Sequence, residues 1–250
     1  ALFFINQVLG LEYQVNVTLC ITLLVAIWWV TEALPIPVTS IIPFALFPLF
    51  GVLSHKQAAS ALGSHVILLL MGAFMLSKAV EKSGVHHRFA LTLVNKLGPD
   101  SPKRIVLGFM LASAFLSMWI SNTASTVVML PIAMSVINLL IEDEDGFTKR
   151  DRNFALSVML GIAFSANAGG IATVIGTPPN SVLIGLLENE YNIEISFLKW
   201  MIIGLPFSLI MISICYLVLV KAFFPTQGLK FKASKTIIHE ELDKLGPTSG

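Results

Sequence analysis

The sequence predicts an all-α protein that crosses a membrane several times, and three observations lead to this fold class. Hydrophobic residues make up 55% of the chain and charged residues only 12%, whereas a soluble domain carries about 25% charged residues. The mean hydropathy is +0.81, so lipid must cover much of the surface. Long stretches of the chain also lack any Lys, Arg, Asp or Glu. The net charge of +1 argues against a nucleic acid as partner.

The charge-free stretches locate the membrane spans, because a spanning helix needs about 20 apolar residues. Some of these stretches fit one helix each, and two are too long for one helix. Both long stretches contain a polar or proline-containing break in their middle. The single-helix stretches are 15–31, 33–55, 57–77 and 200–220, and the two long ones are 105–141 and 153–187.

The basic residues orient these spans, since Lys and Arg are concentrated in cytoplasmic loops. If 78–104 is cytoplasmic, only Lys56 and Lys199 of the sixteen basic residues fall on the outer side. The stretch 105–141 must then leave the cytoplasm and return, because basic residues flank it on both sides. The charge pattern therefore predicts a hairpin with both ends in the cytoplasm.

Two short segments have the pattern of amphipathic helices that lie flat on the cytoplasmic membrane surface. In 85–97, apolar residues recur every four positions, and His, Arg, Asn and Lys cover the other face. Gly98-Pro99 ends this predicted helix. A similar apolar stripe runs through 236–245 and ends at Gly246-Pro247.

The first polar break, 117–126, lies in the middle of the predicted hairpin. Ser117 and Ser121 are four residues apart and would share one helix face. If the chain turns at Asn122-Thr123, one helix ends and another begins there, exposing unpaired carbonyls and unpaired N–H groups. The carbonyls with Ser and Asn oxygens suit a hard cation, and the N–H groups suit an anion. Alternatively, these side chains only form hydrogen bonds within their own helix or to a neighbouring helix.

The second break contains Gly176-Thr177-Pro178-Pro179-Asn180, preceded by Gly169-Gly170. The two prolines remove backbone donors and must unwind the helix of 153–187. Unwound backbone at membrane depth is tolerated only inside protein or along a water-filled cavity. Gly176 allows a close approach of the backbone, so its carbonyl could face a cation. A proline kink that serves packing alone is the alternative.

The residues that are absent narrow the possible functions. Neither long stretch carries a Lys or Arg, so a bound anion would need helix N-termini and co-bound cations rather than an arginine. Glu32 is expected near the membrane interface, and the histidines lack metal-binding spacing. No catalytic triad, P-loop or zinc motif occurs, so we expect neither an enzyme nor an organic cofactor.

Four segments together resemble the divalent anion/sodium symporter family, which includes the INDY-type dicarboxylate and citrate transporters. They occur in the family's order: 28–37 (WWVTEALPIP), 71–76 (MGAFML), 121–123 (SNT) and 176–180 (GTPPN). The resemblance covers roughly 20–225, and it implies an inverted-repeat, elevator-type transporter that works as a homodimer.

The resemblance also implies a division of the chain and a role for each part. Residues 1–80 would be scaffold-type transmembrane helices, 81–98 an interfacial helix and 225–250 a cytoplasmic amphipathic tail. Residues 99–224 would be part of the moving transport domain. This part would contain a re-entrant hairpin over 105–141, a broken helix over 153–187 and a helix over 200–220.

The family pattern implies two overlapping groups of binding residues. Ser117, Ser121, Asn122 and Gly176 would hold a sodium ion, while Asn122 and Thr123 would contact a substrate carboxylate. The unwound segment around them would be supported by Thr177, Pro178, Pro179 and Asn180. Sodium would be the coupling ion.

The chain departs from the family in one respect, because the family carries two inverted repeats, each with a Ser-Asn-Thr hairpin. This sequence has one such hairpin and begins without Met. We therefore expect it to be the N-terminal half of a transporter, without most of the first helix.

The expected function is sodium-coupled symport of di- or tricarboxylates across the plasma membrane, or the inner membrane of a bacterium. C4 dicarboxylates such as succinate are the first candidates, and citrate is next. One alternative is sodium-independent dicarboxylate exchange. Another is an anion-binding sensor or structural membrane protein that transports nothing.

Overall fold

A computed structural model describes residues 12–97, 101–141 and 148–225 of the chain. Helices are the only regular secondary structure in these ranges, which confirms the all-α prediction. The predicted surface segment 236–245, and the proposed tail beyond Pro225, lie outside the described residues. The chain divides into two compact units between Leu68 and Leu69, and we describe each unit by itself.

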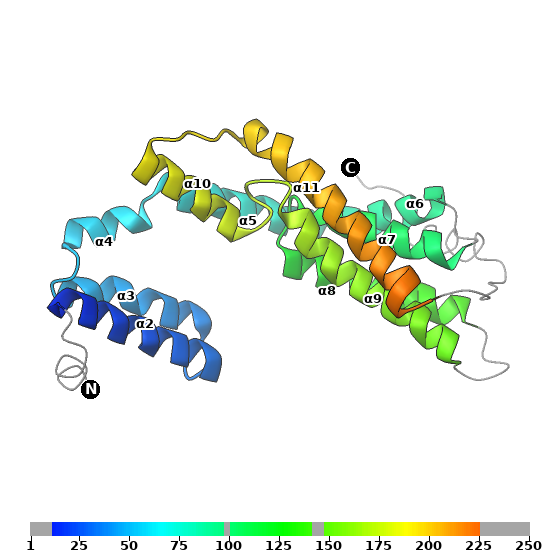
Figure 1. The fold of residues 1–250 in the computed structure, drawn as a ribbon, viewed down its shortest axis with the longest axis horizontal. Helices are drawn as coiled ribbons and strands as arrows, with labels where there is room; N and C mark the ends of the chain where they lie inside the picture. The colour runs from blue at the N-terminus through cyan, green and yellow to red at the C-terminus, as the bar shows by residue number, and fades with distance from the viewer. Residues whose placement is uncertain (1–11, 98–100, 142–147, 226–250) are drawn as a thin grey trace. The chain divides into compact units, whose positions relative to one another are not determined.

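The first unit is built on an antiparallel pair of helices, α2 (Tyr13–Thr31) and α3 (Ile36–Leu49) (Figure 1). The turn between them begins at Glu32, whose φ of 49° is left-handed, and ends at Pro35. Val17, Ile21 and Val25 of α2 pack against apolar residues at the end of α3 and just beyond it, namely Leu46, Phe47, Phe50 and Val52. The short helix α4 (His55–Leu62) follows, and Ser54 and Gln57 form its capping box.

Two sequence predictions in this region differ from the structure. The predicted single-helix stretch 33–55 contains a helix of only 14 residues, α3, which is shorter than the roughly 20 that cross a bilayer. Gly51, with a φ of 70°, follows the end of this helix. The stretch 57–77 forms two helices rather than one. Gly63 caps α4, and α5 (His65–Ser83) begins after Ser64.

Four helical segments among the described residues are long and apolar enough to cross a membrane. This number supports the prediction of several membrane crossings. The segments are Tyr13–Thr31, His55–Ser83, Asn122–Leu140 and Phe197–Phe223.

The second unit brings the two long charge-free stretches together. The first forms a helical hairpin of α7 (Pro102–Ser117) and α8 (Asn122–Leu140). The second is interrupted between α9 (Lys149–Gly170) and α10 (Pro178–Tyr191). A last long helix, α11 (Phe197–Leu217), continues into a π-helical turn at Val218–Phe223. A turn and a helix break thus occur within the two stretches for which the sequence predicts them.

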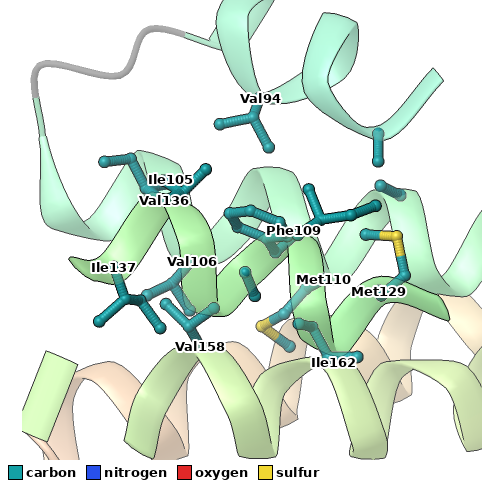
Figure 2. Close-up of a cluster of buried hydrophobic side chains, with 14 of the residues drawn as sticks. Val94, Ile105, Val106, Phe109, Met110, Met129, Val136, Ile137, Val158 and Ile162 are labelled. Atoms are coloured by element: carbon teal, nitrogen blue, oxygen red, sulfur yellow. The ribbon is translucent and has the colours of Figure 1, made fainter. Parts of the chain in front are cut away.

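Helix α7 lies at the centre of this unit and packs against α6, α8, α9 and α11. Phe109 and Met110 of α7 are fully buried, between Val94 of α6 (Val85–Leu97) and Ile162 of α9 (Figure 2). Phe89 and Leu93 of the predicted apolar stripe of α6 also pack against this core, so protein covers at least part of the stripe. The hairpin and α9 form one continuous core, which gives the loops at its end a firm support.

Some of the serines in this core serve packing, as the alternative interpretation of the polar break proposed. The Ser113 hydroxyl donates to the Ile162 carbonyl of α9 at 3.0 Å. The Ser125 hydroxyl donates to the Ser113 carbonyl at 3.0 Å. Both residues are fully buried and join α8 to α7 and α7 to α9. The tip of the hairpin is arranged differently.

Candidate functional site

The tip of the hairpin presents the start of a helix. Helix α7 ends at Ser117, and Ser121 caps α8, its hydroxyl accepting from the Ala124 N–H at 3.2 Å. The N–H groups of Asn122 and Thr123 stand in the first turn, where a helix supplies no acceptor of its own. The dipole of α8 adds the equivalent of about half a positive charge at this end. The tip is therefore suited to bind an anionic oxygen.

The side chain of Asn122 is held from two sides in one orientation. The Ser117 hydroxyl, which is fully buried, donates to Asn122 Oδ1 at 2.5 Å. Asn122 Nδ2 donates to Asn167 Oδ1 of α9 at 3.0 Å. The amide oxygen of Asn122 thus points toward Ser117, and its amino group points toward α9. These two bonds make Asn122 the link between the hairpin and the broken helix.

The break in the second long stretch lies directly against this amide. A Cβ on Gly170, the last residue of α9, would collide with Asn122 Oδ1. A Cβ on Gly176 would lie only 2.5 Å from the Gly170 carbonyl oxygen. Asn122, Gly170 and Gly176 therefore form a layered contact, in which a side chain at either glycine would displace its neighbour.

The loop between α9 and α10, residues 171–177, is fixed by side chains that donate to its carbonyls. Asn180 Nδ2 donates to the carbonyls of Gly170 and Thr173, at 3.0 and 2.8 Å. The Ser181 hydroxyl donates to the Val174 carbonyl at 2.8 Å. Trp200 Nε1 of α11 donates to the Ile171 carbonyl at 2.9 Å. The unwound backbone is thus largely satisfied by protein, as its depth in a membrane would require.

The structure brings most of the predicted site residues to one place. Ser117, Asn122 and Gly176 meet through the contact with Gly170. Ser121 is half-buried and its hydroxyl is used as the helix cap, while Thr123 is exposed beside it. The supporting segment surrounds them: Asn180 is buried, Thr177 is half-buried, and Pro178 and Pro179 are exposed in the first turn of α10.

Three residues outside the predicted binding and supporting set also contact this group. Asn167 is exposed on α9 and bonds the Asn122 amide. Gly170 provides the surface against which that amide rests. Thr173 joins the loop to the hairpin tip, since its hydroxyl donates to the Met118 carbonyl at 2.6 Å. Each is a small or polar residue in the uncharged stretch 153–187 and lies at most eleven residues before Pro178, which is the signal that could have identified them.

The electrostatics of this site come from the backbone rather than from charged side chains. Residues 105–141 and 153–187 contain no Lys, Arg, Asp or Glu. Pro178 and Pro179 deprive the first turn of α10 of two donors, and the Asn180 N–H donates to the Thr177 carbonyl. The N–H groups available to bind an anion are therefore those at the start of α8. Beside them, the carbonyls at the end of α9 carry the partial negative charge of a helix C-terminus.

The oxygen atoms of this site fit a hard cation better than a transition metal. They are the Ser117 hydroxyl, the Asn122 amide oxygen and backbone carbonyls, while thiolate and imidazole ligands suit softer metals. Within the described ranges, no group of three His, Cys, Asp or Glu side chains could hold a metal ion. Donors for an anion and oxygens for a cation thus lie next to each other around one asparagine.

Comparison with known proteins relates the sequence of this chain to those of membrane transporters. A family model described as citrate transporter matches residues 26–240. The chain is 38% identical over 247 residues to the sodium-dependent dicarboxylate transporter SdcS of Staphylococcus aureus strains USA300 and COL. These alignments cover 98% of the chain and 47% of each relative. The chain therefore spans about half the length of the curated relatives it matches.

Proposed function

The chain belongs to the citrate transporter family, among the divalent anion/sodium symporters, and we propose that the protein is a sodium-coupled symporter of dicarboxylates. It is a multi-pass membrane protein of a transporter family and not an enzyme. The relatives from S. aureus carry the name sodium-dependent dicarboxylate transporter, and this supports both the ion and the substrate class. The plasma membrane is the proposed location.

One observation carries the proposal: Asn122 lies where anion donors and cation ligands meet, and no basic side chain is nearby in either long stretch. A substrate carboxylate would accept from the first N–H groups of α8 at Asn122 and Thr123. A sodium ion would take oxygens from Ser117, Ser121, Asn122 and the Gly176 backbone. Since no arginine neutralises the anion, its binding depends on the cation beside it. This dependence would couple the two solutes.

A dicarboxylate needs more hydrogen-bond donors than the helix start in this chain supplies. One helix N-terminus can take one carboxylate, and a dicarboxylate has a second one that needs its own donors. We propose that the rest of the protein supplies them, since the chain spans only 47% of its relatives. Succinate-like C4 dicarboxylates are the first candidates. Citrate is the second candidate, and the description of the matching family as citrate transporter supports it.

The division of the chain is part of the same proposal. Residues 99–224 would form part of a moving transport domain, with 105–141 as a re-entrant hairpin, and residues 1–80 would belong to a scaffold. The packing of α7 against α8, α9 and α11 in one compact unit supports movement of these helices as one body. An elevator-like motion, an inverted second repeat and a homodimer complete the proposal.

The proposal is tested by uptake of radiolabelled succinate into liposomes that contain the full-length protein. We expect an inward sodium gradient to drive accumulation, and replacement of sodium by choline to abolish it. Unlabelled citrate in excess should compete, and its inhibition constant gives its rank against succinate. Uptake that ignores sodium but exchanges against internal dicarboxylate would instead establish an exchanger. Binding without uptake would indicate a sensor.

Replacing Asn122 by alanine should weaken sodium and substrate together. The substitution removes the oxygen next to Ser117 and the link to Asn167, both within the same site. A lost hydrogen bond to a charged ligand costs about 1.5–3 kcal/mol, so both half-saturation constants should rise by about tenfold or more. Asn138→Ala is the matched control, because Asn138 is an exposed residue near the other end of α8. Unchanged sodium activation in Asn122→Ala would refute the shared role.

A further inference from the structure

Thr173 occupies an unusual position between the two breaks. It lies in the loop between α9 and α10, and its side chain is fully buried. Its hydroxyl donates to the carbonyl of Met118, the residue that caps α7 at the hairpin tip, at 2.6 Å. The same hydroxyl accepts from the Gly176 N–H at 3.0 Å. One oxygen atom therefore contacts the backbone of both segments that form the site.

Asn180 secures the other side of the same loop. Its amide donates both to Gly170 and to Thr173, so the first turn of α10 holds the ends of the segment 170–173. With the carbonyl of Thr173 held by Asn180, the Thr173 side chain is presented toward Met118. Gly176 is then fixed on one side by the Thr173 hydroxyl and on the other by its contact with Gly170.

We propose that Thr173 is a positioning residue that ties the hairpin tip to the loop and thereby sets the sodium affinity of the site. The proposal rests on the function proposed above. Thr173 need not touch the ion, because it fixes the distance between the Asn122 amide on the hairpin and the Gly176 backbone in the loop. Misplacement of ligands by about 1 Å is enough to weaken a preorganised site severely.

The hydroxyl oxygen of Thr173 makes both of these hydrogen bonds, so the proposed role depends on this atom. Its hydroxyl supplies one proton to Met118 and one lone pair to Gly176, and serine can do the same. Valine has the shape of threonine but neither the donor nor the acceptor, so it would leave both backbone groups without a partner. Thr173→Ser and Thr173→Val therefore separate the hydrogen bonds from the volume of the side chain.

The test measures succinate uptake by the full-length protein in liposomes as a function of sodium concentration. We expect Thr173→Val to raise the half-saturating sodium concentration by about tenfold, as loss of a buried hydrogen-bond pair implies. Thr173→Ser should stay within about twofold of the unmodified protein, since it keeps both bonds. If Thr173→Val cannot be recovered, Thr173→Ala removes the same hydroxyl without placing a methyl group against Met118.

Ser181→Ala provides the matched control. Ser181 is buried, and its hydroxyl donates to the Val174 carbonyl within the loop, whereas the Thr173 hydroxyl donates to the hairpin. We expect this variant to lose thermal stability yet keep its sodium half-saturation. A shift of sodium affinity in Thr173→Val alone supports the positioning role.

Two outcomes would overturn the proposal, and they can be told apart. If the unmodified protein transports without sodium, the proposed function itself fails, and the role of Thr173 fails with it. If the unmodified protein requires sodium but Thr173→Val and Ser181→Ala both lose stability with unchanged sodium affinity, only the positioning role is wrong. The hydroxyl would then be a structural bond like that of Ser181.

Discussion

Replacement of Gly169 by alanine is expected to prevent the second unit from packing correctly. A Cβ at this position of α9 would overlap the backbone of Ala114 in α7, with the Cα at 2.6 Å and the carbonyl carbon at 2.7 Å. Backbone atoms of a helix cannot turn aside as a side chain can. The two helices would have to separate, and the bonds of Ser113 across their interface would be lost.

The size of this effect follows from the close packing of protein interiors. Overpacking a well-filled core costs about 1–3 kcal/mol, and more where the backbone must shift. Most domains have only about 5–15 kcal/mol of stability in total. We therefore expect Gly169→Ala to lower the yield of monodisperse full-length protein sharply, or to lower its melting temperature by several degrees, in size-exclusion and thermal-shift measurements.

Gly63→Ala is the control for this prediction. Gly63 caps α4 with a φ of −88°, and the nearest atoms to a Cβ there are 3.8 and 3.9 Å away. The same chemical change at this position should alter stability by no more than about 0.5 kcal/mol. If Gly169→Ala proved as stable as Gly63→Ala, the backbones of α7 and α9 could not be in contact at Ala114.

The sequence predicted the hairpin and the broken helix because both depend on local chemistry. Pro178-Pro179 remove two consecutive backbone donors and therefore favour a helix start over a helix interior. A charge-free stretch that is flanked by basic residues at both ends is expected to return to its starting side. The turn predicted at Asn122-Thr123 lies within a residue of the start of α8 at Asn122. The prediction that Ser117 and Ser121 share one helix face is wrong, because α7 ends at Ser117 and Ser121 caps α8. These signals do not depend on which segments pack together.

Other features could not be predicted because they arise only from tertiary contacts. Nothing in the local sequence shows that Asn122 would pair with Asn167, or that Gly169 would lie against Ala114. Hydropathy also concealed the break at Gly63, because the residues on both sides of it are uncharged. The serines were ambiguous for the same reason. Ser113 and Ser117 are the same residue type and lie four positions apart on α7. The Ser113 hydroxyl donates to α9, however, and the Ser117 hydroxyl donates to Asn122.

Gly170→Ala, one residue further along α9, is expected to weaken the binding of sodium and succinate while leaving the fold in place. Here the added Cβ would collide with the side-chain oxygen of Asn122 and not with a backbone. A side chain can rotate away, so the helices can keep their packing. The displaced amide would lose its bonds to Ser117 and Asn167. We expect a melting temperature close to that of the unmodified protein, and sodium and succinate half-saturation constants raised at least about tenfold.

A double-mutant cycle with Asn122→Ala shows whether the collision is the cause. Two changes that act through one contact are not additive, whereas independent changes usually add within about 0.5 kcal/mol. In the Asn122→Ala background no amide remains to be displaced, so adding Gly170→Ala should change neither half-saturation constant further. If the two substitutions instead multiplied their effects on sodium affinity, Gly170 would act on the site by a route other than Asn122. The layered contact of Asn122, Gly170 and Gly176 would then not be the basis of sodium binding.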